Sequence, residues 1–131
     1  MFWSAWEWLI RPLHYRAVRR LRTAAEAGDL DGIRTLLDPT ISVVVESGGD
    51  DSVVRVVQGV HDAAALLAHG FAPHDDMLVQ ERSVNSQAGL MMVRSGRPIA
   101  SVAVDFTGRL ISVVWVKLRP AGLRNWNTVY A

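Results

Sequence analysis

The sequence predicts a small α+β domain in which two helices precede two strands, a third helix and a four-stranded meander. The strongest indication is the segment 77–118, where three nearly continuous apolar runs are separated only by short polar turns. β-branched residues at this spacing are typical of antiparallel strands joined by tight turns. The second indication is the helical periodicity of the first third of the chain. The length of 131 residues and a hydrophobic content of 50% fit one folded domain.

Two helices are expected before the first strand. From Leu13 onward, apolar residues recur at intervals of three and four, at Ala17, Val18, Leu21, Ala24 and Ala25. Gly28 is suited to the left-handed position that ends a helix. Asp29 or Asp31 then caps a second helix, and Asp38-Pro39 ends it. Its predicted apolar face consists of Leu30, Ile33, Leu36 and Leu37.

The strands follow in two groups. Segments 41–46 and 53–57 predict two strands joined by a polar turn, and segment 59–69 predicts a helix with Ala63, Leu66 and Leu67 facing inward. The meander strands are expected at 77–84, 88–93, 99–106 and 110–118. Because these strands are apolar on both faces, each face needs cover from helices, a lined cavity or a partner chain.

Several classes of function are disfavoured by composition. A net charge of +1 gives no electrostatic reason to expect nucleic-acid binding. The absence of cysteine excludes disulfides, thiolate zinc sites and thiol nucleophiles, and is consistent with a cytoplasmic location. The four histidines are scattered, so no metal or cofactor is expected. No phosphate-binding loop or serine-hydrolase motif is present.

The first ten residues carry three of the five tryptophans. Their apolar run is too short to span a bilayer, which takes about 20 residues. Two interpretations remain. The segment packs on its own domain or on a dimer partner, or it lies at a membrane surface with Arg11, Arg16 and neighbouring arginines following it.

Several motifs together resemble a known superfamily. They are the run Ala24-Ala-Glu-Ala-Gly-Asp-Leu-Asp-Gly-Ile-Arg-Thr-Leu-Leu-Asp-Pro39, the strand end Glu46-Ser-Gly-Gly49, the turn Val84-Asn-Ser-Gln-Ala-Gly-Leu90, and the ending Ile111-Ser-Val-Val-Trp-Val-Lys-Leu-Arg-Pro-Ala-Gly-Leu123. In this order they are similar to the nuclear transport factor 2-like (SnoaL-like) superfamily. The nearest version is the C-terminal accessory domain of actinobacterial extracytoplasmic-function sigma factors. Ser86, Arg119 and Gly122 depart from the usual glycine, asparagine and lysine. No sigma-factor DNA-binding region precedes the domain, so a promoter-recognition role is not carried over.

The resemblance implies a cone, in which a strongly curved mixed sheet wraps around three helices and encloses an apolar cavity at its open end. Many relatives form dimers through the outer sheet face, so a homodimer of this kind is expected. The domain is assigned to residues 13–125, after a Trp-rich extension of residues 1–12 and before a tail of residues 126–131.

Few polar residues are candidates for chemistry in such a cavity. Asp105 and Glu46 are the candidate general bases, since a carboxylate buried in a cavity has a raised pKa. A turn-capping or solvated role is the alternative for Asp105, which precedes a turn. Residues 77–84 alternate so that Gln80 and Arg82 share one face, and whether this face is inner or outer stays open.

The remaining cavity candidates are Arg82, His61, Trp115 and Met92. The alternative for His61 is an exposed position on the helix surface. The alternative for Trp115 is a position in the core or in the sheet interface. Two functions follow. One is a non-catalytic, homodimeric module that binds a small apolar ligand or a protein partner. The other is an isomerase, polyketide cyclase or hydratase that uses one cavity carboxylate.

Overall fold

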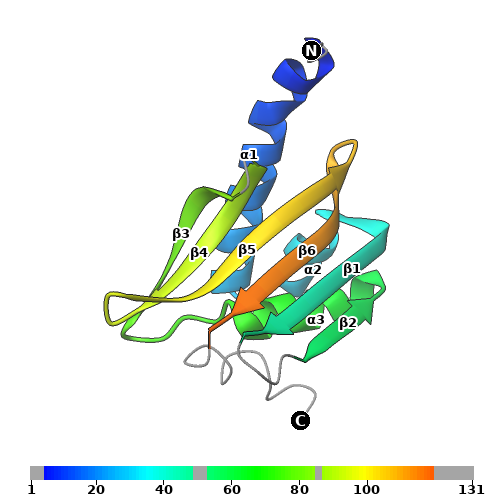
Figure 1. Cartoon of the computed structure of the whole chain (residues 1–131). Helices are drawn as coiled ribbons and strands as arrows, with labels where there is room; N and C mark the ends of the chain where they lie inside the picture. Colours follow the sequence, from blue (N-terminus) through cyan, green and yellow to red (C-terminus); the bar gives the residue numbers. More distant parts are fainter. Residues whose placement is uncertain (1–4, 49–52, 85–86, 120–131) are drawn as a thin grey trace.

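The computed structural model describes residues 5–48, 53–84 and 87–119, with side chains from residue 12 onward. Within these residues the chain forms the predicted order of three helices and six strands (Figure 1). The elements are α1 (Ala5–Glu26), α2 (Leu30–Arg34), β1 (Leu37–Ser47), β2 (Val54–Gln58), α3 (Val60–Gly70), β3 (Met77–Val84), β4 (Gln87–Arg94), β5 (Arg97–Thr107) and β6 (Leu110–Leu118). The predicted α+β class is confirmed.

Helix α1 is longer than the sequence predicted. It begins at Ala5 and continues through Pro12, so the helix runs from the Trp-rich extension into the domain. It ends as expected at Gly28, which has a φ of 68° and whose N–H donates to the carbonyl of Ala25. The packing of the Trp-rich side chains and the tail of residues 126–131 lie outside the described part of the chain.

The boundary between α2 and β1 differs from the prediction. The helix ends at Arg34 rather than at Leu37, and the strand already begins at Leu37. Asp29 caps the helix start by accepting from the N–H of Gly32, and the Thr35 hydroxyl donates to the carbonyl of Gly32 at the other end. Pro39 lies in β1 where the pairing with β6 shifts register, a place that does not require its missing N–H.

The six strands form one open sheet in the order β2-β1-β6-β5-β4-β3. The predicted four-stranded meander is confirmed, because β3, β4, β5 and β6 pair in sequence as antiparallel neighbours. β1 pairs antiparallel with β2 and parallel with β6, so the sheet is mixed. β2 and β3 are its two edges.

The two faces of the sheet have different surroundings. The helices pack on the inner face (Figure 1), where alternate strand residues form the core with α1 and α3. This inner set includes Ile41, Val43, Leu90, Met92, Val102, Val104, Val114 and Val116, each no more than 1% exposed. The outer face has no such cover from the described residues, and leaves Val54, Val56, Leu78 and Trp115 exposed. No helix in the described part of the chain is both long and apolar enough to cross a membrane.

Candidate functional site

The candidate base Glu46 lies on the outer face of the sheet. In β1 the inner positions are Ile41, Val43 and Val45, so Glu46 takes the opposite side of the strand. Its carboxylate Oε2 accepts a hydrogen bond from the indole Nε1 of Trp115 at 3.0 Å. Glu46 therefore orients an aromatic side chain on the outer surface.

Asp105 is exposed and also lies on the outer face, near the end of β5. Its strand partner is Val113, whereas the partner of Glu46 on the same strand β6 is Lys117. Four residues of strand separate those partners by roughly 13 Å, so the two carboxylates do not converge on one reacting group.

Arg82 and Gln80 share the outer face of the edge strand β3, which answers the question of parity that the sequence left open. The Arg82 guanidinium donates from Nη2 to Oε1 of Gln80 at 2.9 Å. Three strands lie between β3 and β1, so Arg82 is far from Glu46.

The other two candidates are also apart. His61 is exposed in the first turn of α3, and Met92 is fully buried on the inner face of β4. Of the six residues that the sequence suggested, the structure brings only Glu46 and Trp115 into a hydrogen bond within its described part.

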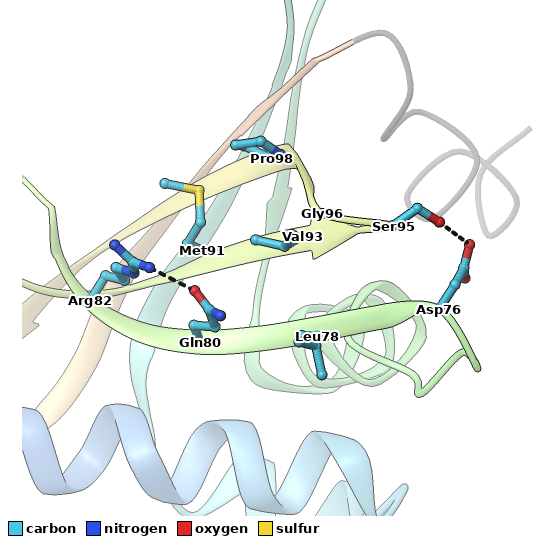
Figure 2. Close-up of a pocket in the computed structure, with 9 residues that line it drawn as sticks. All are labelled: Asp76, Leu78, Gln80, Arg82, Met91, Val93, Ser95, Gly96 and Pro98. Atoms are coloured by element: carbon cyan, nitrogen blue, oxygen red, sulfur yellow. Dashed lines mark hydrogen bonds between the residues drawn. The ribbon is translucent and has the colours of Figure 1, made fainter.

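A groove lies on the outer face over β3, β4 and β5 (Figure 2). These strands form the half of the sheet that is farther from β1 and Glu46. The groove has a volume of about 470 Å³, is open to solvent and is lined mainly by apolar side chains. Leu78, Met91, Val93 and Pro98 supply these apolar groups. Its volume is within the range of small-molecule sites, about 300 to 1,000 Å³.

The groove has two different polar ends. Arg82 and Gln80 lie at one end, and Asp76 and Ser95 at the other (Figure 2). The Ser95 hydroxyl donates to Asp76 Oδ2 at 3.2 Å, and Arg94 Nε lies 3.7 Å from Asp76 Oδ1. The acidic end is thus already engaged by neighbouring groups of the chain.

The β4–β5 hairpin shapes this groove. Ser95 and Gly96 have φ values of 49° and 78°, as two-residue type I′ turns require, and the twist of such turns matches the right-handed twist of the flanking strands. The register shifts beside Val93, which lies opposite Pro98. We infer that twist and register shift together curl this corner of the sheet and hollow its outer face.

The polar groups on the inner face serve packing. Glu81 Oε1 lies 3.0 Å from Arg19 Nε, and Glu81 Oε2 lies 2.8 Å from Arg22 Nη2, which fixes α1 against β3. His14 of α1 stacks on Phe106 of β5, and its Nε2 lies 3.0 Å from the carbonyl oxygen of Gly108. No group of three or more potential metal ligands occurs among the residues that the structure describes.

Sequence reasoning missed the groove. The alternation of Leu78, Gln80 and Arg82 could have indicated its β3 wall, and the Ser95-Gly96 pair could have indicated the tight hairpin. Neither pattern reveals that β4 and β5 twist enough to leave a hollow, because that depends on the register between strands.

Comparisons with known proteins support the fold. No family model matches the chain, and no curated protein matches it by sequence. Among solved structures, the extracytoplasmic function sigma factor SigJ of Mycobacterium tuberculosis superposes with a TM-score of 0.60 at 22% identity. That match covers 92% of this chain and 47% of SigJ, so the chain spans about half the length of that relative.

Two further structures are similar over most of their own length. An NTF2-like protein of unknown function from Burkholderia xenovorans has a TM-score of 0.56 at 16% identity, covering 89% of this chain and 95% of that one. A ketosteroid isomerase-like protein from Kribbella flavida has a TM-score of 0.57 at 11% identity, covering 83% and 79%. The chain therefore has the nuclear transport factor 2-like fold.

Proposed function

We propose that this nuclear transport factor 2-like domain is a non-catalytic interaction module that forms a homodimer through the outer face of β2, β1 and β6. The observation that carries the proposal is an apolar surface on these three strands, which we call the outer apolar patch. It consists of Val44, Val54, Val56, Val113 and Trp115.

The patch is continuous because its members are neighbours in register. Val56 pairs with Val44, and Val44 pairs with Trp115. Val56 is 55% exposed and Trp115 is 42% exposed. Large apolar side chains gathered on one uncovered sheet face are typical of an interaction surface.

The charges beside the patch favour a second copy of the same chain as the partner. Glu46 and Lys117 are in register on neighbouring strands, so both signs of charge border Trp115. In a twofold-symmetric contact the same patch meets itself, and each acidic group can approach the basic group of the other copy. A patch that carries both signs is thus self-complementary.

The alternative is an isomerase, cyclase or hydratase with Glu46 or Asp105 as base. It receives less support, because both carboxylates lie on the outer face and Glu46 already accepts the indole N–H of Trp115. A base that works inside a cavity has to be secluded from bulk water, whereas Asp105 is exposed.

Sedimentation velocity across a range of protein concentrations tests the homodimer. Val56→Lys should convert the dimer to a monomer, since a charge then faces its own symmetry mate or apolar surface. Leu78→Lys is the matched control, because Leu78 is at least as exposed on the outer face but lies outside the patch. A wild-type protein that stays monomeric at high concentration, or a dimer that survives Val56→Lys, would overturn the proposal.

A further inference from the structure

We propose that the outer-face groove over β3, β4 and β5 binds an amphipathic anion, namely a carboxylate that carries an unbranched alkyl chain. The site is separate from the outer apolar patch, so it does not depend on the dimer. Its walls, its charge and its shape each contribute to the assignment.

The walls favour an apolar chain. Leu78, Met91, Val93 and Pro98 come from three successive strands and all line the groove. Leu78 is 62% exposed, the highest value among the large apolar residues of the described chain. An alkyl chain laid along the groove would remove this surface from water, which stabilises the complex by roughly 0.8 kcal/mol per buried CH₂. Met91 adapts its shape to flexible chains, because its side chain is unbranched.

The charge favours an anionic head group at one end. Arg82 has Gln80 as its partner, and that partner is a neutral amide oxygen. Among the described residues no carboxylate lies within ion-pair distance of Arg82. The nearest acidic residue in sequence, Glu81, points to the other face and binds Arg19 and Arg22. The guanidinium therefore keeps donors for a carboxylate, which it can bind in a bidentate manner.

The Asp76 end of the groove disfavours an anion and therefore determines which way round the ligand lies. Asp76 places a negative charge there, partly engaged by Ser95 and Arg94. The head group is thus attracted to the Arg82 end and repelled at the Asp76 end. Asp76 directly precedes β3, and Arg82 lies six positions further along the chain, about 20 Å away along the strand, which is long enough for an extended chain.

The arrangement of Gln80 adds a positioning role. Its side-chain carbonyl holds the Arg82 guanidinium over the groove at 2.9 Å, as the dashed line in Figure 2 shows. A guanidinium held in this way loses less rotational freedom when it binds a carboxylate. Gln80 therefore orients Arg82 and leaves the ligand contact itself to the guanidinium.

Titration of the ¹⁵N-labelled protein with decanoate, followed by NMR, tests this inference. Decanoate should shift the amide signals of Leu78, Gln80, Met91 and Val93, and decanol, which has the same chain without the charge, should bind more weakly. Arg82→Gln should weaken decanoate binding about tenfold or more and leave decanol binding unchanged. Arg20→Gln is the matched control, since it removes the same charge from an exposed position on α1.

Any one of the following outcomes would overturn the inference. They are the absence of saturable decanoate binding, equal affinities for decanoate and decanol, an unchanged decanoate affinity in Arg82→Gln, and shifts confined to the helices or the inner face. If the groove signals shift with protein concentration alone, a second copy covers the groove and the ligand assignment is wrong. The test is independent of Val56→Lys, so the failure of one proposal is distinguishable from the failure of the other.

Discussion

The indole Nε1 of Trp115 donates a hydrogen bond to the Glu46 carboxylate at 3.0 Å on the outer face of the sheet. This contact joins β6 to β1, the parallel pair that connects the strands of the meander to the first half of the chain. It also holds the largest exposed aromatic group of the outer apolar patch in one orientation. The pair therefore links the architecture of the sheet with the proposed interaction surface.

Glu46→Ala should release the Trp115 side chain. We expect the indole N–H resonance of Trp115 to move and to exchange faster with water, because its acceptor is lost. The free energy of unfolding should fall by only about 1 kcal/mol or less, since the pair is partly exposed. ¹⁵N NMR and urea denaturation measure the two effects. Glu26→Ala on α1 is the control, and an indole signal unchanged by Glu46→Ala would contradict the assignment.

Met92 should behave as a core residue. Its side chain is fully buried on the inner face of β4, so Met92→Ala should lower the free energy of unfolding by about 2 to 5 kcal/mol. Met92→Leu conserves the volume and should cost less than about 1.5 kcal/mol. Chemical denaturation distinguishes the two variants. If Met92→Ala left the free energy of unfolding nearly unchanged, Met92 would line open space. That result would agree with the prediction from the sequence that Met92 lines a ligand cavity.

Gly89 and Gly28 should respond differently to alanine. A Cβ at Gly89 would lie 2.4 Å from the carbonyl oxygen of Val102, so Gly89→Ala must displace the neighbouring strand and should cost roughly 3 kcal/mol. A Cβ at Gly28 meets nothing within 4 Å, and the cost there comes from its φ of 68°, about 1 kcal/mol. Thermal and urea unfolding of both variants test the order. Equal losses would show that the strand contact is looser than the structure indicates.

His14 and Phe106 should fix the β5–β6 hairpin to α1. Their ring centroids lie 3.8 Å apart with planes inclined by 2°, and His14 Nε2 also contacts the carbonyl of Gly108. His14→Ala should therefore lower stability by about 1 kcal/mol and speed amide hydrogen exchange in the hairpin at residues 106–110. His61→Ala, on the exposed face of α3, is the matched control. Unaltered exchange in the hairpin would contradict this role.

The order of elements was predictable because it depends on local patterns. The turn predicted at Thr107-Gly108 and the alternation within 110–118 require only near neighbours. The alternation is confirmed, and the turn lies one residue later than predicted, at Gly108-Arg109, because Thr107 still pairs with Leu110. The end of α2 was predicted three residues too late. Leu36 and Leu37 continue a helical apolar pattern, whereas in the structure Leu37 pairs with the distant Ile111. A partner 74 positions away leaves no local signal.

The candidate site was less predictable, because the type of a residue does not determine on which face of the sheet its side chain lies. Glu46 follows a run of valines that is apolar on both sides, so the alternation within 41–46 cannot distinguish inner from outer. Strand geometry alone places Arg82 and Gln80 on one face and Glu81 on the other. Because both faces carry polar residues, polarity does not identify the outer face. The structure resolves this, since Glu81 meets the arginines of α1 on the inner side.

The parallel pairing of β1 with β6 has a consequence for how the chain folds. Val43, Val44 and Val45 are made early during synthesis, but their partners Val114, Trp115 and Val116 follow about 70 residues later. Until then one edge of β1 has no strand beside it, and contacts of such long sequence separation form slowly. A newly made chain thus carries an unpaired valine strand for a period in which other nascent chains or chaperones compete with β6 for it.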